Sequence, residues 1–275
     1  MWFINWRPKV EPTYWRKQKS TEPAFANMMW SKPENKRLAG KLLIIGGNAH
    51  SISAPAAAYQ AATEAGIGTI RVLLPDAIAK TIGQSFPEGE FAFSTPSGSF
   101  SKTAVRQVAE NKDWADALLL AGDFGRNSET AIFIEQTIQK NKCPLVITQD
   151  GLDYFIQDIG KLTDHENNMI VSELGRLQKM TRAGMPSLII QHSMTLHSLV
   201  GLLNSWTRET PARILTYHND NFIYAEGGQV STTPGSDGVG WEASLAAYAA
   251  TWWLQNEGQS FEAVTTAIYE FVTKK

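Results

Sequence analysis

The sequence predicts an α/β protein in which a mostly parallel sheet is covered by helices on both faces. Short apolar runs alternate with helical segments at the spacing of βα units, which favours parallel strands joined by crossover helices. These runs are apolar without alternation, as is typical of strands buried on both faces. The 275 residues, of which 43% are hydrophobic and 19% charged, suffice for one large domain and exclude bulk disorder.

The elements follow one another in regular order. The first strand ends at the pair Gly46-Gly47, and the next helix has Pro55 near its first turn and ends at Gly66. The predicted strands are residues 41–45, 69–74, 117–121, 144–148, 187–190 and 212–216, followed by a hairpin at 221–225 and 228–231. The predicted helices are residues 54–64, 105–111, 129–140, 195–206, 241–255 and 261–272, and residues 153–185 are expected to be largely helical and polar.

Residues 1–39 are set apart from the α/β domain, which we place at residues 40–275. This segment combines prolines, basic residues and seven large aromatic side chains: Trp2, Phe3, Trp6, Tyr14, Trp15, Phe25 and Trp30. The prolines argue against a long regular element, and the aromatic side chains argue against a free tail. We expect an ordered, extended arm that lies along its own domain or a neighbouring subunit and buries several tryptophans. A nucleic-acid arm is the alternative.

The charge is unevenly distributed. The formal net charge is −2, but residues 1–41 carry nine Lys and Arg against three Glu, so this part is at +6 and the rest at −8. An acidic body predicts no specific nucleic-acid partner. The single cysteine, Cys143, gives no disulfide framework and no cysteine metal site. No apolar run reaches the roughly 20 residues of a membrane span, so we expect a cytoplasmic protein with no membrane partner.

A glycine-rich loop before the Ala-rich helix at 241–255 is the main functional candidate. Its glycines, among them Gly235 and Gly238, let the backbone turn tightly and approach a ligand. Ser236 or Asp237 is predicted to cap the helix. The helix N-terminus is an anion site, where Asp237 would act as a base beside a bound phosphate. The alternative is that Asp237 is only a cap and the glycines only shape a turn.

The predicted strand ends place more polar residues near this loop. Gly46-Gly47, Gly122-Asp123, Gln149-Asp150 and Gln191-His192 each follow a predicted strand. Because ligands of parallel sheets bind beyond the carboxyl ends of the strands, we expect these segments to converge with Asp237 in one pocket. Simpler roles stay open: a loop cap for Asp123 and for Asp150, and a structural role for His192.

Five segments carry a resemblance to a known family. They are residues 40–47 with Ala54-Pro55 and residues 65–68; residues 116–130; residues 144–152; residues 189–195; and residues 234–237. In this order they resemble motifs of the ribokinase-like superfamily, over residues 38–270. Within it the closest resemblance is to the ADP/ATP-dependent NAD(P)H-hydrate dehydratases. The resemblance implies a ribokinase-like three-layer sandwich.

No motif is intact. Asp150 falls on the second Asp of the family's Asp-Ala-Asp-Ala-Leu, His192 on the His of Leu-Thr-Pro-His-Pro-Gly-Glu, and Asp237 on the catalytic Asp of Gly-Thr-Gly-Asp. Asp123 brings a carboxylate into a segment that faces the substrate pyrophosphate in the family. The remaining departures are Thr148 and Thr195 in place of acidic residues, Pro234 and Ser236 in place of glycines, and Tyr217-His218 near the family's phosphate-binding Lys-Gly.

The resemblance implies a nucleotide-dependent repair of hydrated NAD(P)H. ADP or ATP would phosphorylate the hydroxyl of the hydrated nicotinamide ring, and loss of phosphate would restore NADH or NADPH. Asp237 would be the catalytic base; Gly235, Ser236, Gly238, Tyr217 and His218 would bind the nucleotide phosphate; and Gly46, Gly47, Asn48, Gly122, Asp123, Gly125, Asp150 and His192 would bind the substrate. Mg²⁺ would accompany the nucleotide, with no metal-ligating residues assigned on the chain.

Two other functions stay open from the sequence. One is a catalytically silent relative that binds a nucleotide or dinucleotide, and the other is a small-molecule kinase of the same superfamily. Because fold alone does not decide function, the altered motifs leave both in place. In each case we expect small-molecule nucleotide partners and a homo-oligomer.

Overall fold

The structure is a computed structural model and describes residues 12–83, 89–139, 141–185 and 187–274. Over these ranges it contains one ten-stranded sheet in the order β1-β10-β9-β8-β7-β6-β5-β2-β3-β4. The strands are β1 (Trp15–Lys17), β2 (Lys41–Gly46), β3 (Thr69–Pro75), β4 (Gly89–Ala92), β5 (Ala117–Gly122), β6 (Leu145–Thr148), β7 (Asn168–Glu173), β8 (Arg213–His218), β9 (Asn221–Glu226) and β10 (Gln229–Pro234). Strands β8 to β4 in this order are parallel, whereas β9 runs against both neighbours.

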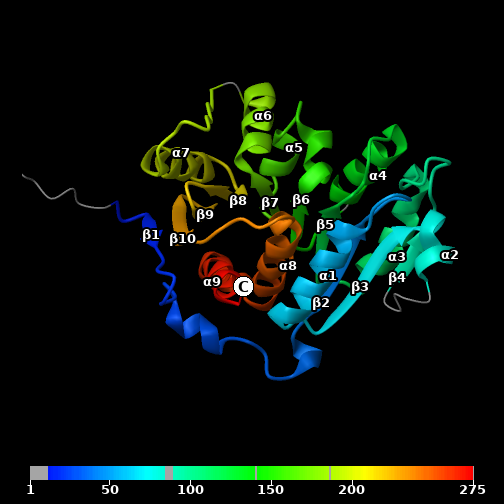
Figure 1. The fold of residues 1–275 in the computed structure, drawn as a ribbon, viewed down its shortest axis with the longest axis horizontal. Coiled ribbons are helices and arrows are strands. Elements are labelled where there is room, and N and C mark those ends of the chain that lie inside the picture. The colour runs from blue at the N-terminus through cyan, green and yellow to red at the C-terminus, as the bar shows by residue number, and fades with distance from the viewer. Residues whose placement is uncertain (1–11, 84–88, 140, 186, 275) are drawn as a thin grey trace, which may run out of the picture.

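Helices cover both faces of the sheet, which confirms the predicted three-layer arrangement (Figure 1). The helices are α1 (Ser53–Ala65), α2 (Ala79–Ile82), α3 (Val105–Lys112), α4 (Ser128–Gln139), α5 (Gly160–Thr163), α6 (Leu174–Gly184), α7 (Leu196–Glu209), α8 (Trp241–Gln255) and α9 (Ser260–Thr273). Alternate residues of β2 serve opposite cores: Leu42 and Ile44 pack with α1, α8 and α9, while Leu43 and Ile45 pack with α3, α4, α6 and α7.

One predicted strand is wrong and another was missed. Residues 187–190 form no strand, and Ile189 has an exposed fraction of 61%. The place between β6 and β8 is taken by β7, inside the stretch expected to be helical. Its apolar run, Met169 to Val171, is only three residues long and lies between polar residues, so local pattern alone favours neither state. Two edge strands of three and four residues, β1 and β4, were also not predicted.

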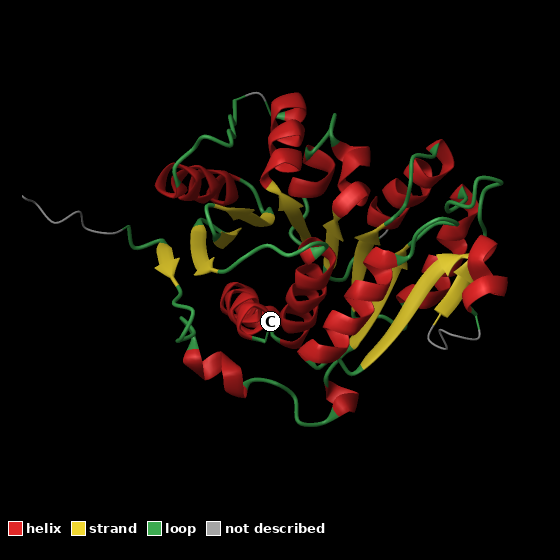
Figure 2. Cartoon of the chain, in the orientation of Figure 1, coloured by secondary structure: helices red, strands yellow, loops and turns green. Residues whose placement is uncertain are grey.

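The described part of the arm, residues 12–39, runs along the domain and adds β1 to the sheet (Figure 2). The Nε1 of Trp15 donates to Thr232 Oγ1 at 3.0 Å, and Lys32 forms an ion pair with Glu270 at 2.6 Å. The expectation of several buried tryptophans is wrong for Trp30, whose exposed fraction is 89%. Trp2, Phe3 and Trp6 lie outside the described residues. The domain boundary at residue 39 stays a prediction.

No helix within the described ranges is long and apolar enough to cross a membrane.

Gln18 fixes the arm to the domain, so its loss is expected to destabilise the fold. Its buried Nε2 donates to Thr233 Oγ1 (2.8 Å) and to the carbonyl of Thr265 (3.0 Å), and its Oε1 accepts the N–H of Ala24 (2.9 Å). Gln18→Ala leaves these partners unsatisfied and is expected to lower the free energy of unfolding by about 2–3 kcal/mol in urea denaturation. Lys19→Ala, at an exposed neighbour, is the control and should cost less than about 1 kcal/mol. Equal effects of the two changes would contradict this role.

Candidate functional site

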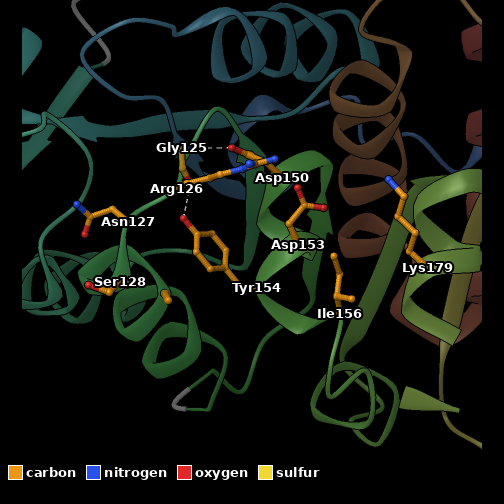
Figure 3. Close-up of a pocket in the computed structure, with 10 residues that line it drawn as sticks. Gly125, Arg126, Asn127, Ser128, Asp150, Asp153, Tyr154, Ile156 and Lys179 are labelled. Atoms are coloured by element: carbon orange, nitrogen blue, oxygen red, sulfur yellow. Dashed lines mark hydrogen bonds between the residues drawn. The ribbon is translucent and has the colours of Figure 1, made fainter. Parts of the chain in front are cut away.

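The carboxyl edge of the sheet carries two separate cavities. The Asp237 cavity, of about 400 Å³, is lined by Glu173, Leu174, Gly175, His192, Tyr217, His218, Asn219, Asp237 and Trp241. The Asp150 cavity, of about 700 Å³, is lined by Gly125, Arg126, Asn127, Ser128, Ala131, Asp150, Asp153, Tyr154, Ile156 and Lys179 (Figure 3). The strand ends do converge on one edge, but the prediction of a single pocket is wrong. Gly46 and Gly122 line neither cavity.

Asp237 lies in the exposed loop between β10 and α8. Gly240, with φ of 73°, is the N-cap of α8, and no side chain caps this helix, so the prediction that Ser236 or Asp237 does so is wrong. The loop spans six residues, 235–240, between strand and helix, and this length separates Asp237 from the first helical turn. Asp237 is therefore free to face the cavity near the positive end of a 15-residue helix.

The backbone of this loop offers fewer free donors than expected. The N–H of Gly235 donates to the carbonyl of Asp220 (3.0 Å), where β9 and β10 form a hairpin, so it cannot hold a phosphate in this conformation. Gly235 is a close-contact position, because a Cβ there would come within 2.9 Å of Val272. In the described structure, no hydrogen bond involves the N–H groups of Ser236, Gly238 and Gly240. Together with the N–H of Val239, which likewise forms no hydrogen bond among the described residues, these groups are the available anion donors of the loop.

The side chain of Tyr217 supports this loop through its hydroxyl and its ring. Its hydroxyl can donate to Asp220 Oδ1 at 3.2 Å or to the carbonyl of Gly235 at 3.3 Å. Its ring packs against Phe222 and Trp241, with centroids 5.0 and 6.2 Å away. Burial raises the pKa of the Tyr217 hydroxyl, while the backbone N–H of Asp237, which faces the oxygen, lowers it. Tyr217 thus contacts both sides of the loop that carries Asp237.

Two histidines line the same cavity. His192 comes from the irregular segment after residue 186 and not from a strand end; its ring lies over Gly175, where a Cβ would come within 3.1 Å of Nε2. His218, at the end of β8, is buried and donates from Nε2 to the carbonyl of Met194 at 2.7 Å. Its other ring nitrogen is the one that a ligand could use.

In the second cavity, Asp150 is a partly buried carboxylate with one unused oxygen. It lies in the 3-10 segment Gln149–Phe155 that follows β6, and its Oδ2 accepts the N–H of Gly125 at 2.9 Å. Its Oδ1 is buried without a hydrogen-bond partner among the described residues. Burial raises the pKa of Asp150, although the N–H groups of Gly125 and Phe124 oppose the shift. Tyr154 donates its hydroxyl to the carbonyl of Gly125, and burial raises its pKa to about 12.

An ion-pair bridge separates the two cavities. Arg176, on α6, donates from Nε to Asp153 Oδ1 (3.0 Å) and from a terminal guanidinium nitrogen to Glu242 Oε1 (3.1 Å). The same oxygen of Glu242 accepts the N–H of Glu173 at 3.1 Å. Asp153 lines one cavity and Glu173 the other. Burial raises the pKa of Glu242, and Arg176 opposes this shift by favouring the charged form.

The carboxylate of Asp123 is engaged in hydrogen bonds within the fold. Its Oδ2 accepts hydrogen bonds from Ser51 Oγ (2.8 Å), Ser53 Oγ (3.0 Å) and the N–H of Ala54 (2.8 Å). The carboxylate therefore occupies the N-terminus of α1, where a substrate phosphate would otherwise find a donor. Asn48 donates to the carbonyl of Asp123 at 2.7 Å and supports the same turn.

The predicted glycines at the strand ends serve close backbone contacts. The N–H of Gly47 donates to the carbonyl of Gly122 at 2.9 Å, and a Cβ on Gly46 would come within 2.5 Å of that carbonyl oxygen. Gly122 has φ of 117° and lies against the side chain of Gln149. Only Gly125 of the predicted substrate glycines lines a cavity.

Several residues were missed from the sequence: Arg126, Asn127, Tyr154 and Lys179, which line the Asp150 cavity, and Arg176 and Glu242, which form the ion-pair bridge. Arg126 and Asn127 directly follow a segment that was singled out, so proximity in sequence was an available signal. Arg176 and Lys179 lie on a helix whose preceding strand was not predicted, and no local pattern distinguishes them from surface charges.

A divalent cation would be bound mainly by the phosphates of the nucleotide. In the part of the chain that the structure describes, no three His, Cys, Asp or Glu side chains gather as a metal site. Mg²⁺ is commonly held by one or two carboxylates together with substrate phosphates and water, and Asp237 with Glu173 would suffice for that mode.

A family model described as NAD(P)H-hydrate dehydratase matches residues 42–244. The bifunctional NAD(P)H-hydrate repair enzyme Nnr of Salinibacter ruber is 31% identical over 132 residues, which cover 47% of this chain and 24% of that protein. The enzyme of the same name from Moorella thermoacetica is 24% identical over 161 residues, or 54% of this chain and 29% of the relative. The matched part of the chain thus spans about a quarter of the length of these curated relatives.

Solved structures confirm the ribokinase-like fold. A ribokinase-like superfamily protein from Enterococcus faecalis has a TM-score of 0.73 and 15% identity, covering 97% of this chain and 89% of that chain. An ADP/ATP-dependent NAD(P)H-hydrate dehydratase from Bacillus subtilis, co-crystallised with ATP and Mg²⁺, has a TM-score of 0.61 and 13% identity, covering 87% and 80%. At these identities the likeness establishes the fold.

The raised pKa of Asp150 predicts a pH-dependent stability difference. A carboxyl whose folded pKa exceeds its unfolded value of about 3.9 lowers the free energy of unfolding as pH rises through the interval between the two values. Asp150→Asn lacks this titration. Its free energy of unfolding relative to wild type is therefore expected to improve from pH 3.5 to pH 7 in urea denaturation. A constant difference across this range would show that burial of Asp150 carries no such cost.

Proposed function

The chain belongs to the NAD(P)H-hydrate dehydratase family, and on this premise we propose that it is an ADP- or ATP-dependent NAD(P)H-hydrate dehydratase. The observation that carries the proposal is the position of Asp237. It lies on the loop between β10 and α8, in a cavity formed at the carboxyl ends of β7, β8 and β10. This edge is where parallel α/β sheets bind their ligands. The bound ATP and Mg²⁺ of the B. subtilis enzyme support a nucleotide in the same fold.

Asp237 is the proposed base. Its carboxylate would accept the proton of the substrate hydroxyl while that oxygen attacks the terminal phosphorus of ADP or ATP. The N–H groups of Ser236, Gly238 and Gly240, together with the positive end of α8, would hold the transferred phosphate. His192 and Trp241 bound the cavity and restrict water around the reacting groups. Loss of the phosphate then restores the dihydronicotinamide ring.

Tyr217 has a different role from the predicted phosphate contact. Its hydroxyl is engaged with Asp220 and Gly235, so we propose that it positions the Asp237 loop. His218 is tied to Met194 through Nε2 and would supply the wall of the nucleotide cavity. Tyr217 and His218 thus lie near the position of the family's phosphate-binding lysine, and their proposed role is to support the loop and the cavity wall.

A silent nucleotide or dinucleotide binder is the second candidate. It is favoured by Asp123, whose carboxylate fills the donor position at the N-terminus of α1, and by Tyr217 in place of the family's lysine. Thermal-shift measurements with ADP, ATP, NADH and NADPH detect binding independently of turnover, because a ligand of the native state raises the melting temperature. Binding without turnover would favour the silent binder.

The proposal includes the cellular location, the oligomeric state and the partners of the protein. A cytoplasmic, homo-oligomeric enzyme of metabolite repair fits the single cysteine and the aromatic arm. Its partners would be the nucleotide and the hydrated dinucleotide, with no nucleic acid. A salt-sensitive submicromolar affinity for RNA or DNA would contradict this.

Replacement of the base tests the function directly. Asp237→Asn is expected to keep the fold and ADP binding but to cut the kcat of NADH-hydrate repair by about 10²–10⁴, because the proton acceptor is lost. Asp113→Asn, an exposed change at the end of α3, is the matched control and should leave kcat unchanged. If the wild-type protein repairs no hydrated NADH or NADPH with either nucleotide, the dehydratase function is rejected.

Tyr217→Phe tests the positioning role. It keeps the packed ring but removes the hydroxyl that supports the loop, so kcat is expected to fall at least about tenfold with little change in the KM for nucleotide. A rise in KM with kcat unchanged would instead indicate a direct phosphate contact, as the resemblance implied. Unchanged kcat and KM would exclude both roles.

A further inference from the structure

We propose that the Asp150 cavity binds the phosphate-bearing adenosine end of the dinucleotide, with Arg126 and Lys179 as its phosphate-binding residues. The inference rests on the proposed function, since the hydrated nicotinamide would lie in the Asp237 cavity. It assigns a ligand to a cavity that the reaction itself does not use.

Two cations without partners point to an anionic ligand. Arg126 lies in the turn between β5 and α4, and Lys179 lies on α6. Within the described residues, neither side chain forms a hydrogen bond or an ion pair. Figure 3 shows them well separated, with Asp153 and Tyr154 drawn between them. Long basic side chains in this arrangement can approach a phosphate from two sides.

The acidic residues of the cavity leave this charge available. Asp153 is already paired with Arg176, so it does not neutralise Arg126 or Lys179. Asp150 uses Oδ2 for the N–H of Gly125 and keeps a buried, unpartnered Oδ1. Such an oxygen is satisfied by a ribose hydroxyl or an amino group of a ligand.

The remaining walls suit a nucleoside. Tyr154, Ile156 and Ala131 give an apolar surface for a base, while the Tyr154 hydroxyl is occupied by the carbonyl of Gly125. The 12-residue helix α4 begins at Ser128 on the cavity wall and adds the positive end of its dipole. A volume of about 700 Å³ lies in the range of small-molecule sites.

The Arg176 bridge fits a ligand with two ends. Through Asp153 and Glu242 it lies between the Asp150 cavity and the loop that carries Asp237. A dinucleotide would place its reactive ring on one side of the bridge and its adenosine phosphate on the other. ADP or ATP would share the Asp237 cavity with the reactive ring and leave the Asp150 cavity to the substrate.

Charge removal with calorimetry tests the inference. The probes are NADH, NADPH and ADP, titrated into the full chain carrying Arg126→Gln, Lys179→Gln or both. Each change is expected to weaken dinucleotide binding about tenfold, the usual worth of a charge-assisted hydrogen bond, and the loss should shrink at high salt. ADP affinity should stay within about threefold. Arg182→Gln removes a charge from the same helix outside the cavity and is the matched control.

The outcomes separate the two phosphate sources. Loss of affinity for NADPH alone supports binding of the 2′-phosphate, and an equal loss for NADH supports binding of the diphosphate. Unchanged affinity for both dinucleotides, no binding of either by the wild type, or loss of ADP affinity instead overturns the inference. Because calorimetry needs no turnover, an inactive wild type that still binds NADPH through Arg126 rejects the proposed function while this inference stands.

Discussion

Close packing of two alanine-rich helices sets the geometry on which the candidate site depends. Ala58, Ala61 and Ala62 of α1 and Ala246 and Ala250 of α8 are buried in the same core, and the two helices pack directly against one another. Small side chains let their backbones approach closely, which places α8 over β5, β6 and β7. The start of α8 is thereby held at the carboxyl edge of the sheet. This contact fixes the helix end of the Asp237 loop, while β10 fixes its other end.

The second constraint is the Arg176 bridge, which joins three elements that are distant in sequence. Asp153 precedes β7, Arg176 follows it, and Glu242 begins α8. The pairs are partly buried, so removing one partner would leave an unpaired charge at the edge of the sheet. The bridge divides that edge into a small cavity with the candidate base and a larger cavity with free cations. One edge therefore offers two chemically different sites.

The altered motifs are consistent with a family fold whose contacts have been reassigned. Asp123, where the resemblance places a pyrophosphate-facing segment, caps α1, and Tyr217, near the expected lysine, supports the loop that carries Asp237. Gly235 keeps its place because Val272 and Phe222 leave no room for a side chain. Steric contacts explain the glycine of this loop, whereas Asp123 and Tyr217, at positions where the resemblance implies ligand contacts, are engaged within the fold.

The fold class, most strands and helices and the edge of the sheet that carries the candidate site were predictable from the sequence, because apolar runs and glycine turns report burial and chain reversal locally. The sequence placed His192 at a strand end that does not exist, because three apolar residues in β7 are too few to reveal a strand without its neighbours. The tertiary structure alone decided that Asp237 and Asp150 lie in different cavities. That division depends on Arg176 meeting Asp153 and Glu242, which are 23 and 66 residues away in the chain. Side chains at such separations meet only through the folded sheet, so no local pattern records their contact.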